Sequence, residues 1–249
     1  MKIRIIPSIL TDGQTVVKGT QFDNWRTVGM AYATAQLFGH RDVDELMFLD
    51  VKASERNSPI PESLLLSFTE TLNIPFSVGG GISSLETAAR YLNAGAEKVV
   101  IGRAALATPS LVSEVAEKFG SQAVVVAIDV VDFNSGMIAT NCGKDQISHS
   151  VVAWARELES IGAGEILLQS VLRDGKMQGM DHDAIKEVSA SINLPVIASS
   201  GAGSLKECEL AVRSGANAVA IGAMFQFTEI TPKQVRNYLN ACGIDVRAS

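Results

Sequence analysis

The sequence predicts a single α/β domain, a (β/α)8 TIM barrel built from two duplicated half-barrels, and three observations support this fold. The chain has 249 residues, which is a common length for one barrel of this kind. Short unbroken apolar runs alternate with helix-like segments, a pattern typical of a parallel sheet covered by helices. Part of the chain also repeats itself at a constant offset of 120 residues.

The repeat relates residues 74–102 to residues 194–222, which align without a gap. The identities fall mainly at expected turns, including Pro75/Pro195, Gly81/Gly201, Gly95/Gly215 and Gly102/Gly222. The same offset continues upstream, where the segment that begins at Asp44 lies opposite the one that begins at Gly164. A half-length repeat of β–α units indicates a duplicated half-barrel.

The remaining elements fit eight β–α units in order. The expected strands begin near Ile3, Leu46, Pro75, Lys98, Ala123, Glu165, Pro195 and Ala218. The best-defined helix is expected to start after an N-cap at Ser84 and to stop at Gly95. Longer loops follow the first strand (residues 11–29) and the fifth (residues 131–148), the second with a small hairpin. No linker divides the chain, so residues 1–249 are expected to form one domain.

Composition excludes several classes of protein. The formal net charge of −6 disfavours non-specific nucleic-acid binding. The three cysteines, Cys142, Cys208 and Cys242, are scattered, which predicts neither a disulfide framework nor a metal site and favours a cytoplasmic protein. No apolar run has the length of a membrane span, and the N-terminal segment lacks the pattern of a secretory signal. No cofactor motif is present.

Glycine-rich turns at the carboxyl ends of matched strands predict two phosphate sites across one barrel mouth. Glycine lets the backbone approach an oxyanion, and a helix N-terminus offers free N–H groups. The expected phosphate-binding residues are Gly80, Gly81, Gly102 and Arg103 in one half, and Gly175, Ser200, Gly201, Gly222 and Ala223 in the other. The alternative is that these glycines serve only the tight turns. Two sites in one mouth imply a small substrate with two phosphate groups.

Several longer motifs are more specific than the glycines. DELMFLD (residues 44–50), VGGGI (78–82), VVAID (125–129) and GAGEILL (162–168) occur in order. With them the chain resembles the cyclase subunit of imidazole glycerol phosphate synthase over nearly its whole length. The resemblance implies a heterodimer with a class I glutaminase, which delivers ammonia through the barrel. It also implies that this ammonia splits a bis-phosphorylated ribonucleotide and closes an imidazole ring, without metal or cofactor.

The family uses two aspartates across the mouth as acid and base. One matches Asp129, at the end of the fifth strand, where a lone carboxylate would be a costly packing choice. The other should end the first strand, but that stretch is one residue shorter here and its position falls on Leu10. Asp12 is the nearby candidate for a replacement. Lys18 matches a family lysine that closes over the substrate.

Four charged residues match a ring at the bottom of the family barrel that admits ammonia: Arg4, Glu45, Lys98 and Glu165. The alternative is a ring that only stabilises the barrel bottom, since two acids and two bases can neutralise one another.

Three hypotheses therefore remain open. The chain is a cyclase that uses Asp129 with a replacement such as Asp12. Or it resembles paralogues that direct ammonia to the amidation of a sugar in surface-glycan pathways. Or it is a non-catalytic scaffold that binds a phosphorylated ligand and regulates a glutaminase.

Overall fold

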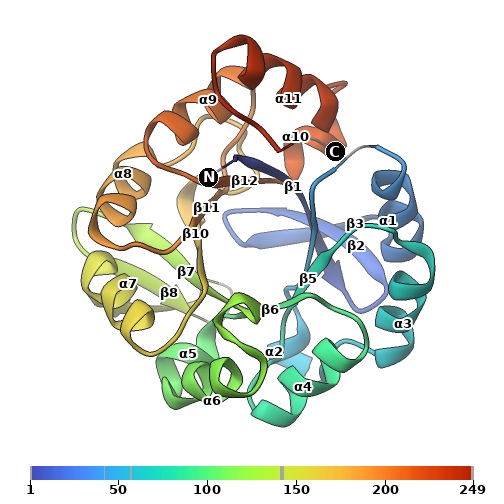
Figure 1. The fold of residues 1–249 in the computed structure, drawn as a ribbon, viewed down its shortest axis with the longest axis vertical. Helices are drawn as coiled ribbons and strands as arrows, with labels where there is room; N and C mark the ends of the chain where they lie inside the picture. The colour runs from blue at the N-terminus through green and yellow to red at the C-terminus, as the bar shows by residue number, and fades with distance from the viewer. Residues whose placement is uncertain (1, 42, 57, 141–142, 248–249) are drawn as a thin grey trace.

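The computed structural model describes residues 2–41, 43–56, 58–140 and 143–247, and its centre is a closed barrel of parallel strands (Figure 1). Each strand pairs with the next, β7 pairs with β10, and β12 returns to pair with β1. The barrel strands are β1 (Arg4–Asp12), β4 (Leu46–Asp50), β5 (Phe76–Gly79), β6 (Lys98–Ile101), β7 (Val124–Asp132), β10 (Glu165–Ser170), β11 (Val196–Ser199) and β12 (Ala218–Ile221). The predicted (β/α)8 fold is confirmed.

Helices of nine or ten residues surround the barrel (Figure 1). They are α1 (Ala31–Gly39), α3 (Glu62–Thr71), α4 (Leu85–Asn93), α6 (Ser110–Phe119), α7 (Val151–Ser160), α8 (His182–Ser191), α9 (Leu205–Arg213) and α11 (Pro232–Ala241). Shorter turns of helix are α2 (Ala53–Arg56), α5 (Arg103–Ala107) and α10 (Ala223–Phe227), with single 3-10 turns η1 (Ser121–Ala123) and η2 (Val171–Arg173). As predicted, Ser84 caps α4 by accepting from Thr87 N at 3.2 Å.

The duplication is visible in the element boundaries. β5, α4, β6 and α5 begin and end 120 residues before β11, α9, β12 and α10, without a shift of a single residue. Matching boundaries mean that the two halves place equivalent turns at equivalent points of the mouth. The two glycine-rich turns therefore face the barrel axis from opposite halves.

The two long loops are more ordered than the sequence suggested. Residues 11–29 contain an antiparallel hairpin of β2 (Thr15–Thr20) and β3 (Asp23–Met30), which extends β1 above the mouth. Its turn has positive φ at Gln21 (55°) and Phe22 (60°), so it lacks the Asn-Gly signal typical of such hairpins. After β7, the antiparallel strand β8 (Met137–Thr140) pairs with β7 across the turn at Asn134, Ser135 and Gly136, where the sequence predicted a small hairpin. β9 (Asp145–Ser148) pairs with the other edge of β8.

Alternation along the strands divides the core into two parts. Ile5 and Ile9 of β1 face the helices and join the larger cluster, whereas Ile6 faces the barrel axis. The inner cluster consists of Ile6, Met47, Val100, Val125, Leu167, Ile197, Ala218 and Ala220, all buried. These side chains fill the barrel, so its interior is a packed core of the type expected for this fold.

No helix within the described ranges is long and apolar enough to span a membrane. Cys208 and Cys242 are free thiols, and Cys142 lies outside the described residues. Trp154 is buried on α7.

Shortening an inner side chain tests this packing. Leu167→Ala should lower the free energy of unfolding by about 2–4 kcal/mol, because Leu167 is fully buried and its neighbours collapse only partly into the space. Urea unfolding followed by circular dichroism measures the change. The matched control is Leu66→Ala on α3, where the leucine is 44% exposed and little stability should be lost. Equal losses in the two variants would contradict the packed interior.

Candidate active site

Two cavities lie at the carboxyl ends of the barrel strands. The first has a volume of about 310 Å³ and the second about 30 Å³. Leu10 of β1 and Gln169 of β10 line both cavities, so the two are adjacent across the axis. Ligands bind at this end of the strands in barrels of this class.

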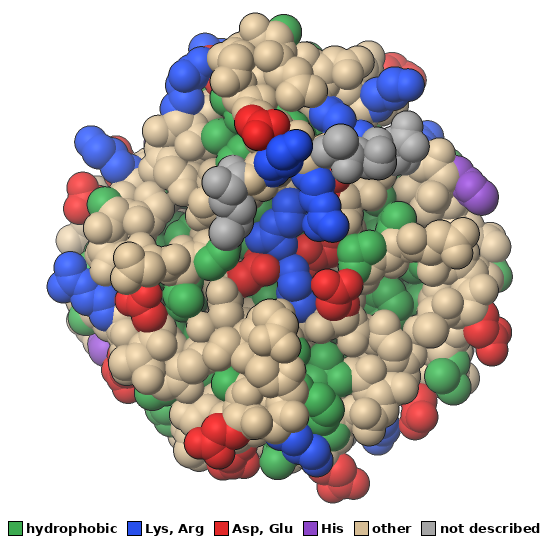
Figure 2. All heavy atoms as spheres, viewed as in Figure 1, with side chains coloured by type: hydrophobic (Ala, Val, Ile, Leu, Met, Phe, Trp, Pro, Cys, Tyr) green, Lys and Arg blue, Asp and Glu red, His purple; other side chains and the backbone are tan. Residues whose placement is uncertain are grey.

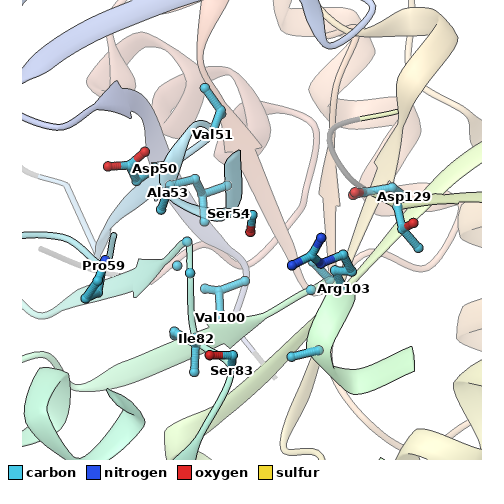
Figure 3. A pocket seen from close by; sticks show the side chains of 18 of the residues that line it. Asp50, Val51, Ala53, Ser54, Pro59, Ile82, Ser83, Val100, Arg103 and Asp129 are labelled. Carbon is cyan, nitrogen blue, oxygen red and sulfur yellow. The ribbon is translucent and has the colours of Figure 1, made fainter. Parts of the chain in front are cut away.

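The first cavity gathers the predicted phosphate residues of the first half. Gly80, Gly81, Gly102 and Arg103 all line it, together with Asp129. Figure 3 shows the Arg103 and Asp129 side chains beside this cavity, with Asp50 and Pro59 on another part of its wall. Arg103 supplies a cation beside the glycine turn, which suits a phosphate group.

The second cavity gathers the predicted phosphate residues of the second half. Gly175, Ser200, Gly201, Gly222 and Ala223 line it, and Lys18 reaches it from the β2–β3 hairpin. The Lys18 Nζ lies 3.4 Å from the Ser8 carbonyl oxygen, and a side chain at Gly222 would collide with it. A side chain at position 222 would therefore displace the Lys18 ammonium from its place in the cavity.

The two cavities, which we call the two phosphate cradles, differ at one pair of positions that the 120-residue repeat relates. Gly80 has φ 115°, and a Cβ there would overlap the Asp50 backbone, so glycine is required. Its counterpart Ser200 also has positive φ (73°), a region that serine seldom occupies. The Ser200 hydroxyl lies 3.3 Å from Asp174 Oδ1, to which it donates a hydrogen bond. Strained backbone of this kind is common at functional sites.

Asp129 is a half-buried acid on the wall of the first cavity, and it forms no ion pair with the described residues. Its Oδ1 has no hydrogen-bond partner among the described residues. Burial raises the pKa of Asp129 to about 7, and the negative charge of Asp174 adds to the rise. A carboxyl with a pKa near neutrality can both give and take a proton, which is the property expected of a general acid or base.

Lys18 and Asp174 both line the second cavity. Burial lowers the pKa of Lys18 to about 8, although Asp174 favours the charged ammonium. Burial also raises the pKa of Asp174, against the opposing effects of Lys18 and the Ser200 hydroxyl. The hairpin thus brings a cation to the mouth from the first predicted long loop.

The structure separates Asp12 from the other candidates. Its carboxylate pairs with Arg56, whose other nitrogen lies 2.7 Å from Asp50 Oδ2. Among the described residues that line the two cavities, Asp12 does not occur, whereas Leu10 lines both. The shortened strand end therefore leaves an apolar side chain in the mouth and turns Asp12 outward.

The four charges at the opposite end form a closed ring of ion pairs. Arg4 lies 3.0 Å from Glu45 and 2.6 Å from Glu165, and Lys98 lies 3.0 Å and 2.9 Å from the same two carboxylates. Burial opposes the ionisation of Glu165, but Arg4 and Lys98 outweigh it and hold its pKa below the usual range. Figure 2 shows acidic and basic side chains gathered at the centre of one face, over the barrel.

Comparison with known proteins agrees with this geometry. Residues 4–231 match the family described as "Histidine biosynthesis protein". The chain belongs to this family. Its relatives include the imidazole glycerol phosphate synthase subunits HisF of Prosthecochloris aestuarii, 42% identical over 98% of both chains, of Thermobifida fusca, 40% identical over 99%, and of Clostridium botulinum, 39% identical over 98%. The resemblance to the cyclase subunit is confirmed at the level of the family.

Three residues of the mouth were not identified from the sequence. Asp50 ends β4 and accepts from Gly13 N, Lys52 N and Arg56. Gln169 lies between the two cavities, and Asp174 lies against Ser200. Their positions in the sequence could have identified them. Each lies at or just after the carboxyl end of an apolar strand, which is the end where a barrel binds its ligand. Among the described residues, no group of His, Cys, Asp and Glu is arranged to hold a metal ion.

The raised pKa of Asp129 predicts a specific dependence of stability on pH. Its pKa is about 7 in the folded chain and about 4 in the unfolded chain, so folding loses free energy as the pH rises through this interval. Asp129→Asn removes this loss. The difference in the free energy of unfolding between the variant and the wild type should therefore favour the variant by about 2–4 kcal/mol more at pH 8 than at pH 4.

Chemical unfolding of both proteins at several pH values measures this difference. Asp132→Asn on the same strand is the control, because Asp132 is exposed and its pKa is lowered by the Ser135 hydroxyl. A pH-independent difference between wild type and Asp129→Asn would show that Asp129 titrates normally.

Proposed function

We propose that this barrel is the ammonia-using subunit of a glutamine amidotransferase of the imidazole glycerol phosphate synthase type. The observation that carries the proposal is the position of Asp129, a carboxyl with a pKa of about 7, on the wall of the larger of two adjacent glycine-lined cavities at the mouth. Ammonia addition and ring closure both require proton transfers, and such a carboxyl can perform them. The 42% identity to a HisF subunit supports the same reaction type.

The substrate is a small molecule with a phosphate group at each end. One phosphate would lie on Gly80, Gly81 and Gly102 near Arg103, and the other on Gly201 and Gly222 near Lys18. Backbone N–H groups and one cation on each side neutralise and orient the two anionic ends. The reacting bond would then lie across Leu10 and Gln169, beside Asp129.

Leu10 favours a second version of this function. An apolar side chain at the end of β1 cannot transfer a proton, and Asp12 is paired with Arg56 outside the cavities. The ammonia acceptor would then differ from the histidine precursor, for example a sugar of a surface-glycan pathway. Both versions use the same ammonia route and the same Asp129.

Turnover with ammonium salts, without any glutaminase, tests the reaction. The purified chain should convert the bis-phosphorylated ribonucleotide of imidazole glycerol phosphate synthase at alkaline pH, where free ammonia is abundant. Asp129→Asn should reduce kcat by about 100-fold or more, the usual contribution of a general acid or base. Full activity of this variant would remove Asp129 from the mechanism.

Leu10→Asp separates the two versions. If the wild-type chain is inactive and Leu10→Asp forms the imidazole product, then the leucine at position 10 is what prevents the cyclase reaction, and the natural ammonia acceptor is a different molecule. If both are inactive but a glutaminase partner is still stimulated by the phosphorylated ligand, the chain is a regulatory scaffold and the proposal of catalysis fails.

We infer that the ring of Arg4, Glu45, Lys98 and Glu165 lies on the ammonia route from a class I glutaminase bound at the bottom face. The ring closes the barrel end with charges that neutralise one another in four ion pairs. Neutral ammonia can enter the barrel through such a ring if one ion pair opens, and it would then pass the apolar inner layer uncharged.

Lys98→Met tests the route. With the partner glutaminase, glutamine hydrolysis should continue while product formed per glutamine falls several-fold, because two carboxylates lose a partner and the ring reorganises. Parallel assays of glutamate and product measure the ratio. Lys2→Met is the control, since Lys2 is 57% exposed in its side chain and contacts only Asp245 at 3.8 Å among the ion pairs described. An unchanged ratio in Lys98→Met would contradict the route.

A further inference from the structure

We propose that Tyr91 is a positioning residue of the first phosphate cradle, because its buried hydroxyl joins two pieces of backbone that form the wall of that cavity. One piece is the glycine turn after β5, and the other is the loop of residues 58–60 that leads toward α3. The inference deepens the proposed function, and it rests on that function only for the choice of phosphate as the ligand.

The side chain of Tyr91 lies wholly inside the protein. Tyr91 is on the buried face of α4, where 0% of its surface is exposed, and it packs in the larger core cluster. A tyrosine buried in this way needs hydrogen-bond partners for its hydroxyl. α4 begins at Leu85, shortly after the glycine turn, and its last turn brings the Tyr91 hydroxyl back to that turn.

The hydroxyl forms hydrogen bonds with backbone groups of both pieces. It accepts from the Ile60 N–H at 2.7 Å and donates to the Gly80 carbonyl oxygen at 3.3 Å. Burial raises the pKa of Tyr91 to about 12, so the hydroxyl keeps the proton that it donates. A hydroxyl can donate one hydrogen bond and accept others. Tyr91 therefore satisfies the loop and the turn at the same time.

The two backbone pieces face the ligand. Gly80 and Gly81 line the first cavity from the turn, and residues 58–59 line it from the loop, with Pro59 visible on the wall in Figure 3. In a trans peptide the carbonyl and the N–H point in opposite directions. Because Tyr91 holds the Gly80 carbonyl on the buried side, the N–H of Gly81 is directed away from Tyr91. Backbone N–H groups fixed in this way are suitable donors to an anion.

The loop depends on contacts of this kind for its position. Residues 58–60 form neither a helix nor a strand. The loop and the turn are closely packed, since a Cβ on Gly81 would lie 3.5 Å from the Pro59 Cα. The hydrogen bond from Ile60 to Tyr91 holds the loop against the turn. A displaced loop would therefore change the shape of the cavity at the glycines.

The second half of the barrel holds the equivalent N–H with a different side chain. α3 and α8 begin 120 residues apart, so Ile60 corresponds to Met180. The Met180 N–H donates to Glu207 Oε2 at 3.1 Å, and Glu207 belongs to α9, the counterpart of α4. The position that corresponds to Tyr91 is occupied by Ala211. In both halves a side chain of the equivalent helix binds this N–H, which favours a role in shaping the cradle over packing alone.

Titration of nitrogen-15-labelled protein with inorganic phosphate tests this role without substrate or partner. The amide signal of Gly81 reports on the first cradle and that of Gly201 on the second. Tyr91→Phe removes only the hydroxyl. It should raise the Kd of phosphate at the first cradle about 3- to 10-fold, which corresponds to about one hydrogen bond to the anion. The Kd at the second cradle should stay unchanged.

Tyr238→Phe is the matched control. It removes a hydroxyl that donates to Glu209 Oε2 at 3.0 Å, and neither residue lines either cradle. Both phosphate affinities should therefore remain those of the wild type.

A measurement on the wild-type fold provides an independent test if Tyr91→Phe folds poorly by circular dichroism. The chain has three tyrosines, which can be labelled with 3-fluorotyrosine. Tyr32→Phe and Tyr238→Phe assign two of the fluorine-19 signals, so the third belongs to Tyr91. Phosphate should shift the Tyr91 signal with the same Kd as the Gly81 amide. A Tyr91 signal that does not respond to phosphate would contradict the positioning role.

Turnover separates this inference from the proposed function. In the ammonium-driven reaction, Tyr91→Phe should raise KM for the bis-phosphorylated ribonucleotide several-fold and leave kcat nearly unchanged, because Tyr91 is buried behind the cavity wall. Unchanged phosphate affinity at the first cradle, or equal losses at both cradles, would overturn the positioning role even if turnover is normal. A selective loss at the first cradle, with no turnover in the wild type, would uphold the role and refute the proposed reaction.

Discussion

Closure of the parallel barrel is the constraint on which the site depends. Because β12 pairs with β1 and the eight barrel strands run in the same direction, their carboxyl ends meet at one rim. Residues that are far apart in sequence, such as Leu10, Asp129 and Gln169, thereby share one cavity. The packed inner layer, in which Leu167 is fully buried, separates this rim from the opposite end.

The barrel buries charge at both ends but stabilises it in different ways. At the bottom, each member of the ring has two partners of opposite sign, which makes burial tolerable. At the mouth, Asp129 forms no ion pair among the described residues, and burial raises its pKa to about 7. An unpaired buried acid costs stability, and sites that perform proton transfer commonly accept this cost.

The sequence predicted the fold almost completely, because the duplication and the buried strand pattern are both local signals. Its glycine pairs also predicted residues that line the two cavities. Gly81 and Gly201 have positive φ, the signal typical of such turns, whereas Gly102 and Gly222 do not. The hairpin turn at Gln21 and Phe22 could not be foreseen, because neither residue favours that conformation. The separation of Asp12 and the approach of Asp174 to Ser200 depend on Arg56 and on η2, which only the folded chain brings together.

The exchange of glycine for serine between the matched turns makes the two halves of the mouth chemically distinct. Gly80 offers only backbone to a ligand, whereas Ser200 offers a hydroxyl that is already engaged with Asp174. Lys18 also approaches one cradle and not its counterpart, since it lines only the second cavity among those two. A ligand with two similar ends would therefore bind in one orientation more tightly than in the reverse orientation. The backbone keeps the symmetry of the duplication, whereas the side chains of the two halves distinguish one end of the ligand from the other.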